Sequence, residues 1–227
     1  MNGVTFKFWG DGSQQAREWI KNIVVRGTDN FNWTFIFIIA VVFFIYGYNM
    51  YKKNWQIVKA GLALYSVHWL YEIVNAIIAK CSGAPLWAVS NDSTTFILLI
   101  GVSWELSMMF SIAGMITFMM VPQDPNKRFF VTKKFKGVSA RLVIAIGMAL
   151  FFALFESFLA GTAGGAKFIW VYKWWGVLPV FITTYIPFFL AAVYVPVMEK
   201  KKGNLFLIIT WSLVVVLLAV LIPCKVI

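Results

Sequence analysis

The stretch NLFLIITWSLVVVLLAVLIP, residues 204–223, holds twenty residues without a charged side chain. Apolar runs of about 18 or more residues indicate helices that cross a membrane. Comparable runs recur along most of the chain, at residues 32–50, 55–79, 94–121, 140–160, 177–198 and 204–223. The sequence therefore predicts an all-α fold, a polytopic membrane bundle of about six transmembrane helices.

The composition agrees with this class of protein. Hydrophobic residues make up 61% of the 227 residues and charged residues only 13%, whereas soluble domains carry about 25% charge. The net charge of +11 is explained by loop Lys and Arg that set topology and meet anionic headgroups. Membrane lipids are thus the expected partners, and nucleic acid is not.

The chain divides into a tail, residues 1–31, and a six-span transmembrane domain, residues 32–227. In the tail, the segment SQQAREWIKNIVV places apolar residues at helical spacing after Ser13, a suitable N-cap, and before Gly27, a suitable stop. Its length and charged face predict an amphipathic helix that lies in the membrane interface.

Orientation is predicted from the loop Lys and Arg residues, which favour the cytoplasmic side. Eleven of them fall on the side that carries residues 52–53, 127–141 and 200–202, and eight fall on the side of the termini. Both termini are therefore expected to be non-cytoplasmic. Cys81 and Cys224 would share that side, where a disulfide between them is one alternative and two unrelated thiols the other.

Three acidic residues, Glu72, Glu105 and Glu156, lie inside predicted spans, where a carboxylate must be protonated, paired or facing a cavity. In HWLYEIVN, residues 68–75, the chain's one histidine, His68, shares a helix face with Glu72 and Asn75. All three acids fall in the same half of the bilayer, which predicts one shared polar cavity.

This layer suits acid–base chemistry on a lipophilic molecule. A desolvated carboxylic acid can protonate a double bond, His68 can act as its partner base, and aromatic faces can stabilise a developing cation. Glu72, Glu105, His68 and Glu156 are the predicted catalytic residues. The predicted substrate-binding residues are Asn75, Tyr65, Trp69, Trp104, Trp174, Trp175 and Tyr185.

Two other interpretations of the same layer stay open. Buried Glu–His and Glu–Asn hydrogen bonds can simply join helices. Alternatively, His68, Glu72 and Glu105, or Glu156, could bind a single metal ion, although no cofactor is the leading expectation. No P-loop, GxGxxG, GxSxG or HExxH motif occurs, and the last span lacks the lysine that a retinal protein needs.

The segments HWLYE and SWELSMMF, with a Glu in each of two consecutive spans, resemble the emopamil-binding-protein family of sterol isomerases and sigma-type receptors. The segment FIWVYKWWGVLPVF would match that family's aromatic-rich final helix. The resemblance implies that Glu72 and Glu105 act as acid and base with support from His68, and that Trp174 or Trp175 stabilises a sterol cation. The sixth span and Glu156 depart from the family pattern.

The sequence therefore predicts an integral membrane enzyme of isomerase or cyclase type, acting on an isoprenoid or sterol-like substrate. Two alternatives remain: a non-catalytic subunit of a larger membrane complex, and a proton-coupled small-molecule transporter.

Overall fold

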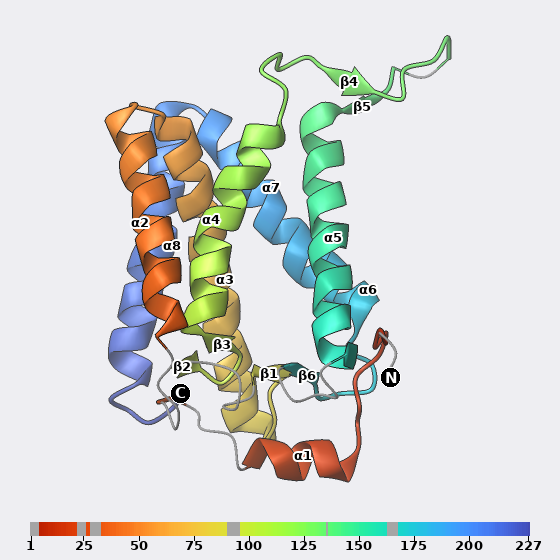
Figure 1. The fold of residues 1–227 in the computed structure, drawn as a ribbon, viewed down its shortest axis with the longest axis vertical. Helices are drawn as coiled ribbons and strands as arrows, with labels where there is room; N and C mark the ends of the chain where they lie inside the picture. Colours follow the sequence, from red (N-terminus) through yellow and green to blue (C-terminus); the bar gives the residue numbers. More distant parts are fainter. Residues whose placement is uncertain (1–4, 22–25, 28–32, 90–95, 135, 163–167) are drawn as a thin grey trace.

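The computed structural model describes residues 5–21, 26–27, 33–89, 96–134, 136–162 and 168–227. Most of these residues form helices that run along the long axis of the molecule, with α7 crossing obliquely (Figure 1). The helices are α1 Gln14–Lys21, α2 Thr34–Tyr51, α3 Trp55–Ser82, α4 Trp104–Met120, α5 Ala140–Thr162, α6 Val177–Pro179, α7 Ile186–Tyr194 and α8 Lys200–Leu221.

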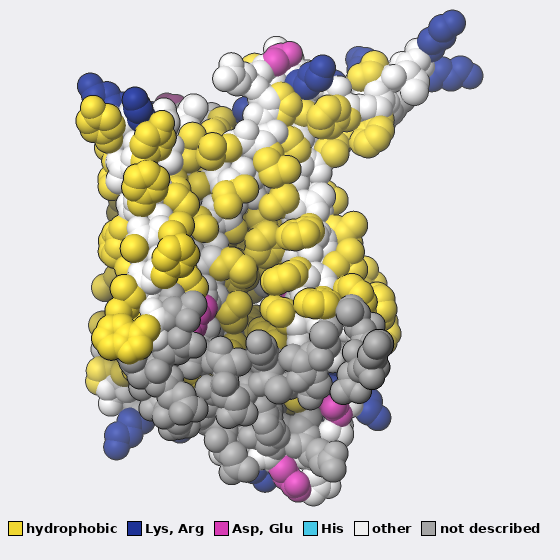
Figure 2. Space-filling model, in the orientation of Figure 1, with side chains coloured by type: hydrophobic (Ala, Val, Ile, Leu, Met, Phe, Trp, Pro, Cys, Tyr) yellow, Lys and Arg dark blue, Asp and Glu magenta, His cyan; other side chains and the backbone are white. Residues whose placement is uncertain are grey.

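Among the described residues, four helical segments are long and apolar enough to cross a membrane: Trp55–Ser82, Ala140–Gly161, Val177–Val197 and Lys200–Leu221. Two further apolar helices, Phe35–Tyr51 and Trp104–Met120, are shorter. Apolar side chains cover the visible face of the bundle between its charged ends (Figure 2). The prediction of a multi-pass helical protein is confirmed in this form, with four long apolar helices and two shorter ones in place of six full spans.

The all-α prediction needs a correction, because three short antiparallel pairs of strands accompany the helices. Strand β1 (Trp87–Val89) pairs with β6 (Phe168–Trp170), β2 (Ile97–Leu99) with β3 (Val102–Ser103), and β4 (Arg128–Phe129) with β5 (Val138–Ser139). The first two pairs lie at the end of the bundle that also carries both chain termini (Figure 1).

The predicted span 94–121 is wrong in its first part, where β2 and β3 form a hairpin. A short apolar run has the same pattern whether it forms a buried strand or a helix, so the sequence does not separate the two. Ser103 marks the true helix start, because its side-chain oxygen accepts the main-chain N–H of Leu106 at 3.4 Å as an N-cap. Residues 94 and 95 of the predicted span lie outside the described residues.

The segment Val177–Val197 contains three prolines, Pro179, Pro187 and Pro196, which favour kinks in a helix. It begins as α6, passes through a π-helical turn at Val180–Tyr185, continues as α7 and ends in a 3₁₀ turn at Val195–Val197. The wider π turn is where the helix departs from regular geometry.

Pro187 creates a specific problem in this segment, which Tyr71 of α3 solves. In an α-helix the carbonyl of residue 183 would accept the N–H of residue 187, but proline has none. The hydroxyl of Tyr71 donates to the main-chain oxygen of Thr183 at 2.7 Å. The Thr183 oxygen thereby gains a donor in place of the N–H that residue 187 lacks.

Helix α3 is central and packs closely against α4 through glycine. A Cβ atom at Gly61 would overlap the side chain of Met115, and one at Gly114 would overlap the main-chain oxygen of Ala60. Small residues at such contacts let membrane helices approach each other directly. On the opposite side of α3, Thr210 of α8 donates a hydrogen bond to Ser66 at 2.9 Å.

The N-terminal tail is hydrogen-bonded to the transmembrane part. The N–H of Gly10 donates to the oxygen of Trp175 at 2.6 Å, and that of Asp11 to the oxygen of Trp170 at 2.9 Å. Helix α1 lies across the end of the bundle (Figure 1). That this helix lies in the membrane interface remains a prediction. Cys81 and Cys224 are free and exposed, and the side of the membrane that this end faces also stays a prediction.

Candidate functional site

A cavity of about 40 Å³ lies among α3, α4, α5 and the π turn that leads into α7. Five phenylalanine rings contribute to its wall: Phe110, Phe152, Phe155, Phe168 and Phe188. Its polar lining consists of His68, Glu72, Trp87, Glu156, Thr184 and Tyr185. A volume of this size holds a few water molecules or a few atoms of a larger molecule, since a site for one water needs about 10–15 Å³.

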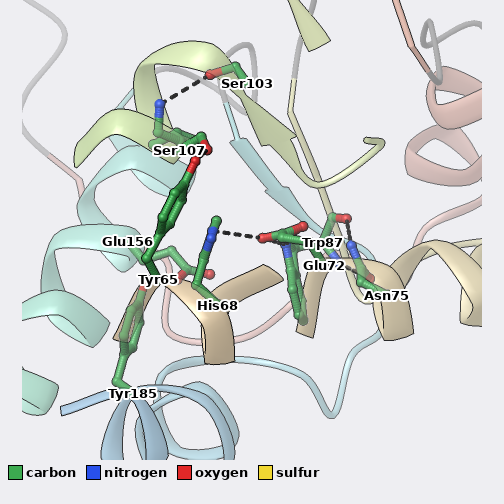
Figure 3. Close-up of polar contacts among 10 residues, drawn as sticks. Tyr65, His68, Glu72, Asn75, Trp87, Ser103, Ser107, Glu156 and Tyr185 are labelled. Carbon is green, nitrogen blue, oxygen red and sulfur yellow. Dashed lines mark hydrogen bonds and ion pairs between the residues drawn. The ribbon is translucent and has the colours of Figure 1, made fainter. Parts of the chain in front are cut away.

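The α3 side of the cavity is formed by His68 and Glu72, one helical turn apart. Nε2 of His68 lies 3.4 Å from Oε1 of Glu72, and both side chains are buried. The imidazole stacks on Phe110 with 4.2 Å between ring centroids. The indole N–H of Trp87 donates to the Glu72 carboxylate, at 3.2 and 3.3 Å from its two oxygens. Figure 3 shows His68, Glu72 and Trp87 pointing toward one another.

The α5 side is formed by Glu156, which accepts two hydrogen bonds. The indole N–H of Trp170, in β6, donates to Oε1 at 2.5 Å, and the hydroxyl of Tyr185, the last residue of the π turn, donates to Oε2. Both donors are buried. The π turn and the β6 strand thus fix the orientation of this carboxyl within the helix bundle.

The charge in this region is unusual for an apolar protein interior. Among the described residues, neither Glu72 nor Glu156 has a Lys or Arg in ion-pair contact, and His68 is the one basic side chain beside them. Burying an uncompensated carboxylate costs several kcal/mol, roughly. A cluster of two carboxyls and one imidazole is therefore suited to holding and exchanging protons.

Several polar atoms in the cavity wall have spare hydrogen-bonding capacity. Within the described part of the chain, the hydroxyl of Thr184 and both ring nitrogens of His68 are buried without a hydrogen bond. Buried polar groups normally bond to protein or to ordered water. These atoms can thus bond to water or to a polar group of a bound molecule.

Two residues beside the cavity position its polar groups. The Asn75 side-chain amide donates to the main-chain oxygen of Trp87 at 2.9 Å and accepts from the N–H of Leu86 at 2.8 Å, which fixes the start of β1. Gly101 faces the carboxylate of Glu72, and a methyl group at this position would overlap that carboxylate and the Trp87 indole. The close approach of the β2–β3 turn to Glu72 therefore requires glycine.

The structure thus places four of the predicted site residues on the cavity, namely His68, Glu72, Glu156 and Tyr185. Glu105 does not line it. It lies half-buried in the first turn of α4, where the helix dipole stabilises a carboxylate. The catalytic role predicted for Glu105 from its depth in the span stays a prediction without a contact to the cavity.

The other predicted substrate-binding residues lie around the cavity rather than on its wall. The Tyr65 hydroxyl is 2.7 Å from Ser107 Oγ, and Trp69 contacts the Tyr65 ring edge-on. Trp104 packs near Phe35 at the start of α4. Trp174 is 59% exposed, whereas Trp175 is buried and stacks on Trp87 with 5.7 Å between centroids. Trp175 thus supports a wall residue without touching the cavity itself.

Sequence reasoning missed Trp87, Trp170 and Thr184. The two tryptophans donate to the two buried carboxyls from short strands, and no periodicity in the sequence connects a strand residue with its helical partner. Trp170 lies in the aromatic stretch FIWVYKWWGVLPVF, which the resemblance assigned to a helix, and Trp87 lies between two predicted spans. Thr184 precedes Tyr185, a predicted substrate-binding residue, and this adjacency is the signal in the sequence that could have identified it.

The alternative of a metal ion at His68, Glu72 and Glu105 lacks geometric support. In the part of the chain that the structure describes, no three His, Cys, Asp or Glu side chains come together closely enough to hold an ion. The pair His68–Glu72 offers two ligands from one helix, and Glu156 is engaged by its indole and phenol donors.

Comparison with known proteins identifies the family. A family model described as "Uncharacterized membrane protein family" matches residues 12–223. A protein of Archaeoglobus fulgidus, described as "Uncharacterized protein", is 30% identical over 190 residues, which are 81% of this chain and 85% of the relative. No solved structure matches. The chain therefore belongs to this membrane protein family.

The resemblance to the emopamil-binding-protein family is wrong. The family model covers nearly the whole chain and belongs to a different family. The structure also removes the basis of the resemblance. Glu105 of SWELSMMF does not line the cavity with Glu72 of HWLYE. The segment FIWVYKWWGVLPVF forms a strand and a turn before its helix begins at Val177.

Proposed function

We propose that this member of the membrane protein family is an integral membrane enzyme that transfers protons to and from a lipophilic molecule. The reaction takes place at His68, Glu72, Glu156 and Tyr185. The observation that supports this is the presence of two buried carboxyls and an imidazole on one cavity with aromatic walls. Intramembrane ionisable residues are costly, so a cluster of them favours a functional role.

The approach of the substrate is lateral, between α4 and α5. On this side the cavity wall includes Met109 of α4 and Phe155 and Leu159 of α5, and Phe155 is 39% exposed. Figure 2 shows apolar side chains lining a hollow between these two helices. A lipid-soluble molecule can then reach the cavity from the bilayer by displacing such apolar side chains. The reacting group alone then occupies the small polar space.

The two halves of the cluster suit two complementary steps. Glu156, oriented by Tyr185 and Trp170, donates its proton to one carbon of a double bond. The resulting cation lies against aromatic faces such as that of Phe110. The His68–Glu72 pair then removes a proton from a neighbouring carbon. One proton is added and one is lost, so a double bond moves or a ring closes without a change in composition.

The test uses the exchange of solvent hydrogen into carbon. The purified full-length protein is incubated in D₂O with a lipid extract of the host organism, and the lipids are analysed by mass spectrometry. The wild type is expected to place deuterium at a carbon of one lipid. Glu156→Gln should reduce the rate about 100-fold or more, as expected for the loss of a general acid.

Two control variants sharpen the result. Glu199→Gln changes an exposed carboxylate paired with Lys202 and should leave exchange unchanged. Glu105→Gln discriminates between the two assignments of the acid: the cavity geometry predicts normal exchange, whereas the sequence-based assignment predicts loss. If the wild type labels no lipid, the enzyme proposal fails. Proton-coupled transport and a non-catalytic role in a membrane complex would then remain.

A further inference from the structure

A second, larger groove of about 980 Å³ lies at the opposite end of the bundle from the β1–β6 pair. It is lined by the turn between α2 and α3, the C-terminal end of α4 with the loop that follows, and the first turn of α5. Trp55, at the start of α3, lies 17 residues before Glu72, so the groove is about 25 Å from the acid cluster along the helix. It is a separate site.

The groove is positively charged. Lys53 and Arg141 are its ionisable lining residues, and no described carboxylate lines it. The acidic residues nearest in sequence do not line the groove: Glu199 pairs with Lys202 at 3.2 Å, and Asp124, which accepts the N–H of Asn126 at 2.9 Å, keeps its negative charge beside the lining residues Gln123 and Pro125. Lys and Arg side chains gather along this end of the molecule (Figure 2). An anion in the groove would thus meet two cationic side chains and no carboxylate among the described lining residues.

Arg141 has capacity for a further partner. Its Nε is buried, and among the described residues it makes no hydrogen bond. A guanidinium N–H that is buried without a partner is costly, and the planar fork of Arg matches the oxygens of a phosphate. The geometry therefore favours an oxyanion over a simple halide ion.

The start of α3 adds to this potential. Its N-cap residue, Asn54, makes no side-chain capping bond, and its side-chain amide donates to Asn49 at 3.2 Å. The 28-residue helix therefore directs the positive end of its dipole toward the groove without a capping side chain. This contribution supports the two basic side chains.

The remaining wall is apolar and continues toward the membrane. Trp55, Phe118, Met119 and Val121 line the groove, and Trp55 and Met119 are also exposed. An exposed Trp at the end of a membrane helix is typical of the boundary between headgroups and acyl chains. A groove that combines cationic side chains with an apolar wall matches an amphiphile that has an anionic headgroup and apolar chains.

We propose that the groove between Lys53 and Arg141 binds the phosphate headgroup of a membrane lipid, with the acyl chains lying along Trp55, Phe118 and Met119. The site is independent of the proton chemistry proposed above. Its volume lies within the range of about 300–1,000 Å³ that ligand pockets occupy.

The experiment is native mass spectrometry of the delipidated full-length protein in detergent. Dioleoylphosphatidylglycerol is titrated against wild type and Lys53→Gln/Arg141→Gln, and dioleoylglycerol serves as the same lipid without phosphate. The wild type should bind the phospholipid and not the diacylglycerol. The double variant should bind it about tenfold more weakly, as expected for the loss of a charge-assisted hydrogen bond.

The matched control is Lys52→Gln/Lys127→Gln, which removes the same charge from exposed residues nearby that do not line the groove. It should bind like the wild type. Equal weakening in both double variants, or undiminished binding to Lys53→Gln/Arg141→Gln, would overturn the proposal. Inorganic phosphate bound as tightly as the lipid would also overturn it, in favour of a soluble phosphate ligand. If the double variant fails to fold, each single variant provides the same comparison.

Discussion

Tyr71→Phe removes one oxygen atom and, with it, the hydrogen bond to the main-chain oxygen of Thr183. This carbonyl has no helical donor at residue 187, which is proline. Loss of the phenol therefore leaves this peptide oxygen with neither its Tyr71 donor nor an N–H at residue 187. We expect the variant to fold and to be less stable than the wild type.

The magnitude follows from two bounds. A polar group left without a partner costs about 1–3 kcal/mol when buried, whereas interhelical hydrogen bonds in membrane proteins contribute about 0.6 kcal/mol on average and about 1.7 at most. Thr183 is exposed on the bundle surface, so relaxation offsets part of the larger figure. We expect a loss of about 1–2 kcal/mol, or a fall of about 2–8 °C in the unfolding midpoint.

The assay is thermal unfolding in detergent followed by the fluorescence of the eleven tryptophans. Tyr194→Phe is the matched control, because the half-buried Tyr194 lies in the helical segment Val177–Val197 that also contains Thr183, and its hydroxyl forms no hydrogen bond within the described chain. The decisive comparison is a cycle with Pro187→Ala, which restores an N–H. Tyr71→Phe should cost less in that background. An equal cost in both backgrounds would refute the assignment.

Three further predictions concern other parts of the chain. Asn75→Leu leaves a buried main-chain donor and the oxygen of Trp87 unsatisfied and should destabilise the protein by about 2–5 kcal/mol, measured by the same melting assay. Thr210→Val removes the bond between α8 and α3 and should lower stability by about 0.6 kcal/mol in chemical denaturation. Hydrogen bonding from Ser13, helped by the hydrogen bond and charge of Lys7 and opposed by desolvation, lowers the pKa of Asp11 below its ordinary 3.8. The folded tail therefore favours the carboxylate, and the small advantage of wild type over Asp11→Asn should be present above about pH 4 and vanish as the pH falls through the lowered pKa. Melting curves of both proteins across this range measure it.

The helical architecture could be predicted because it depends on local composition. Long apolar runs must form helices in a membrane whatever surrounds them, so the predicted spans 140–160 and 204–223 overlap α5 and α8 closely. The predicted third span failed at residues 97–103 because an apolar hairpin and an apolar helix share one composition. Ser103 was the available signal for the helix start, since serine there caps the N-terminus of α4.

The polar cluster could be predicted only in part, for a different physical reason. His68 and Glu72 share a face of α3 by helical spacing alone, and their pairing is local. The partners of Glu156 are Trp170 and Tyr185, which reach it through the β1–β6 pair and the π turn. Such contacts depend on the packing of distant segments, which single-sequence patterns do not contain.

The π turn at Val180–Tyr185 also places a constraint on the evolution of this chain. A wide turn holds one residue more than an α-helix needs, and each residue of an α-helix turns the chain by about 100°. Deleting one residue here would rotate everything that follows, so Phe188 and Tyr185 could no longer face the same cavity. Insertions and deletions should therefore be rare in this segment among relatives that keep both carboxyls, and a relative that lacks the extra residue should have lost Glu156 as well.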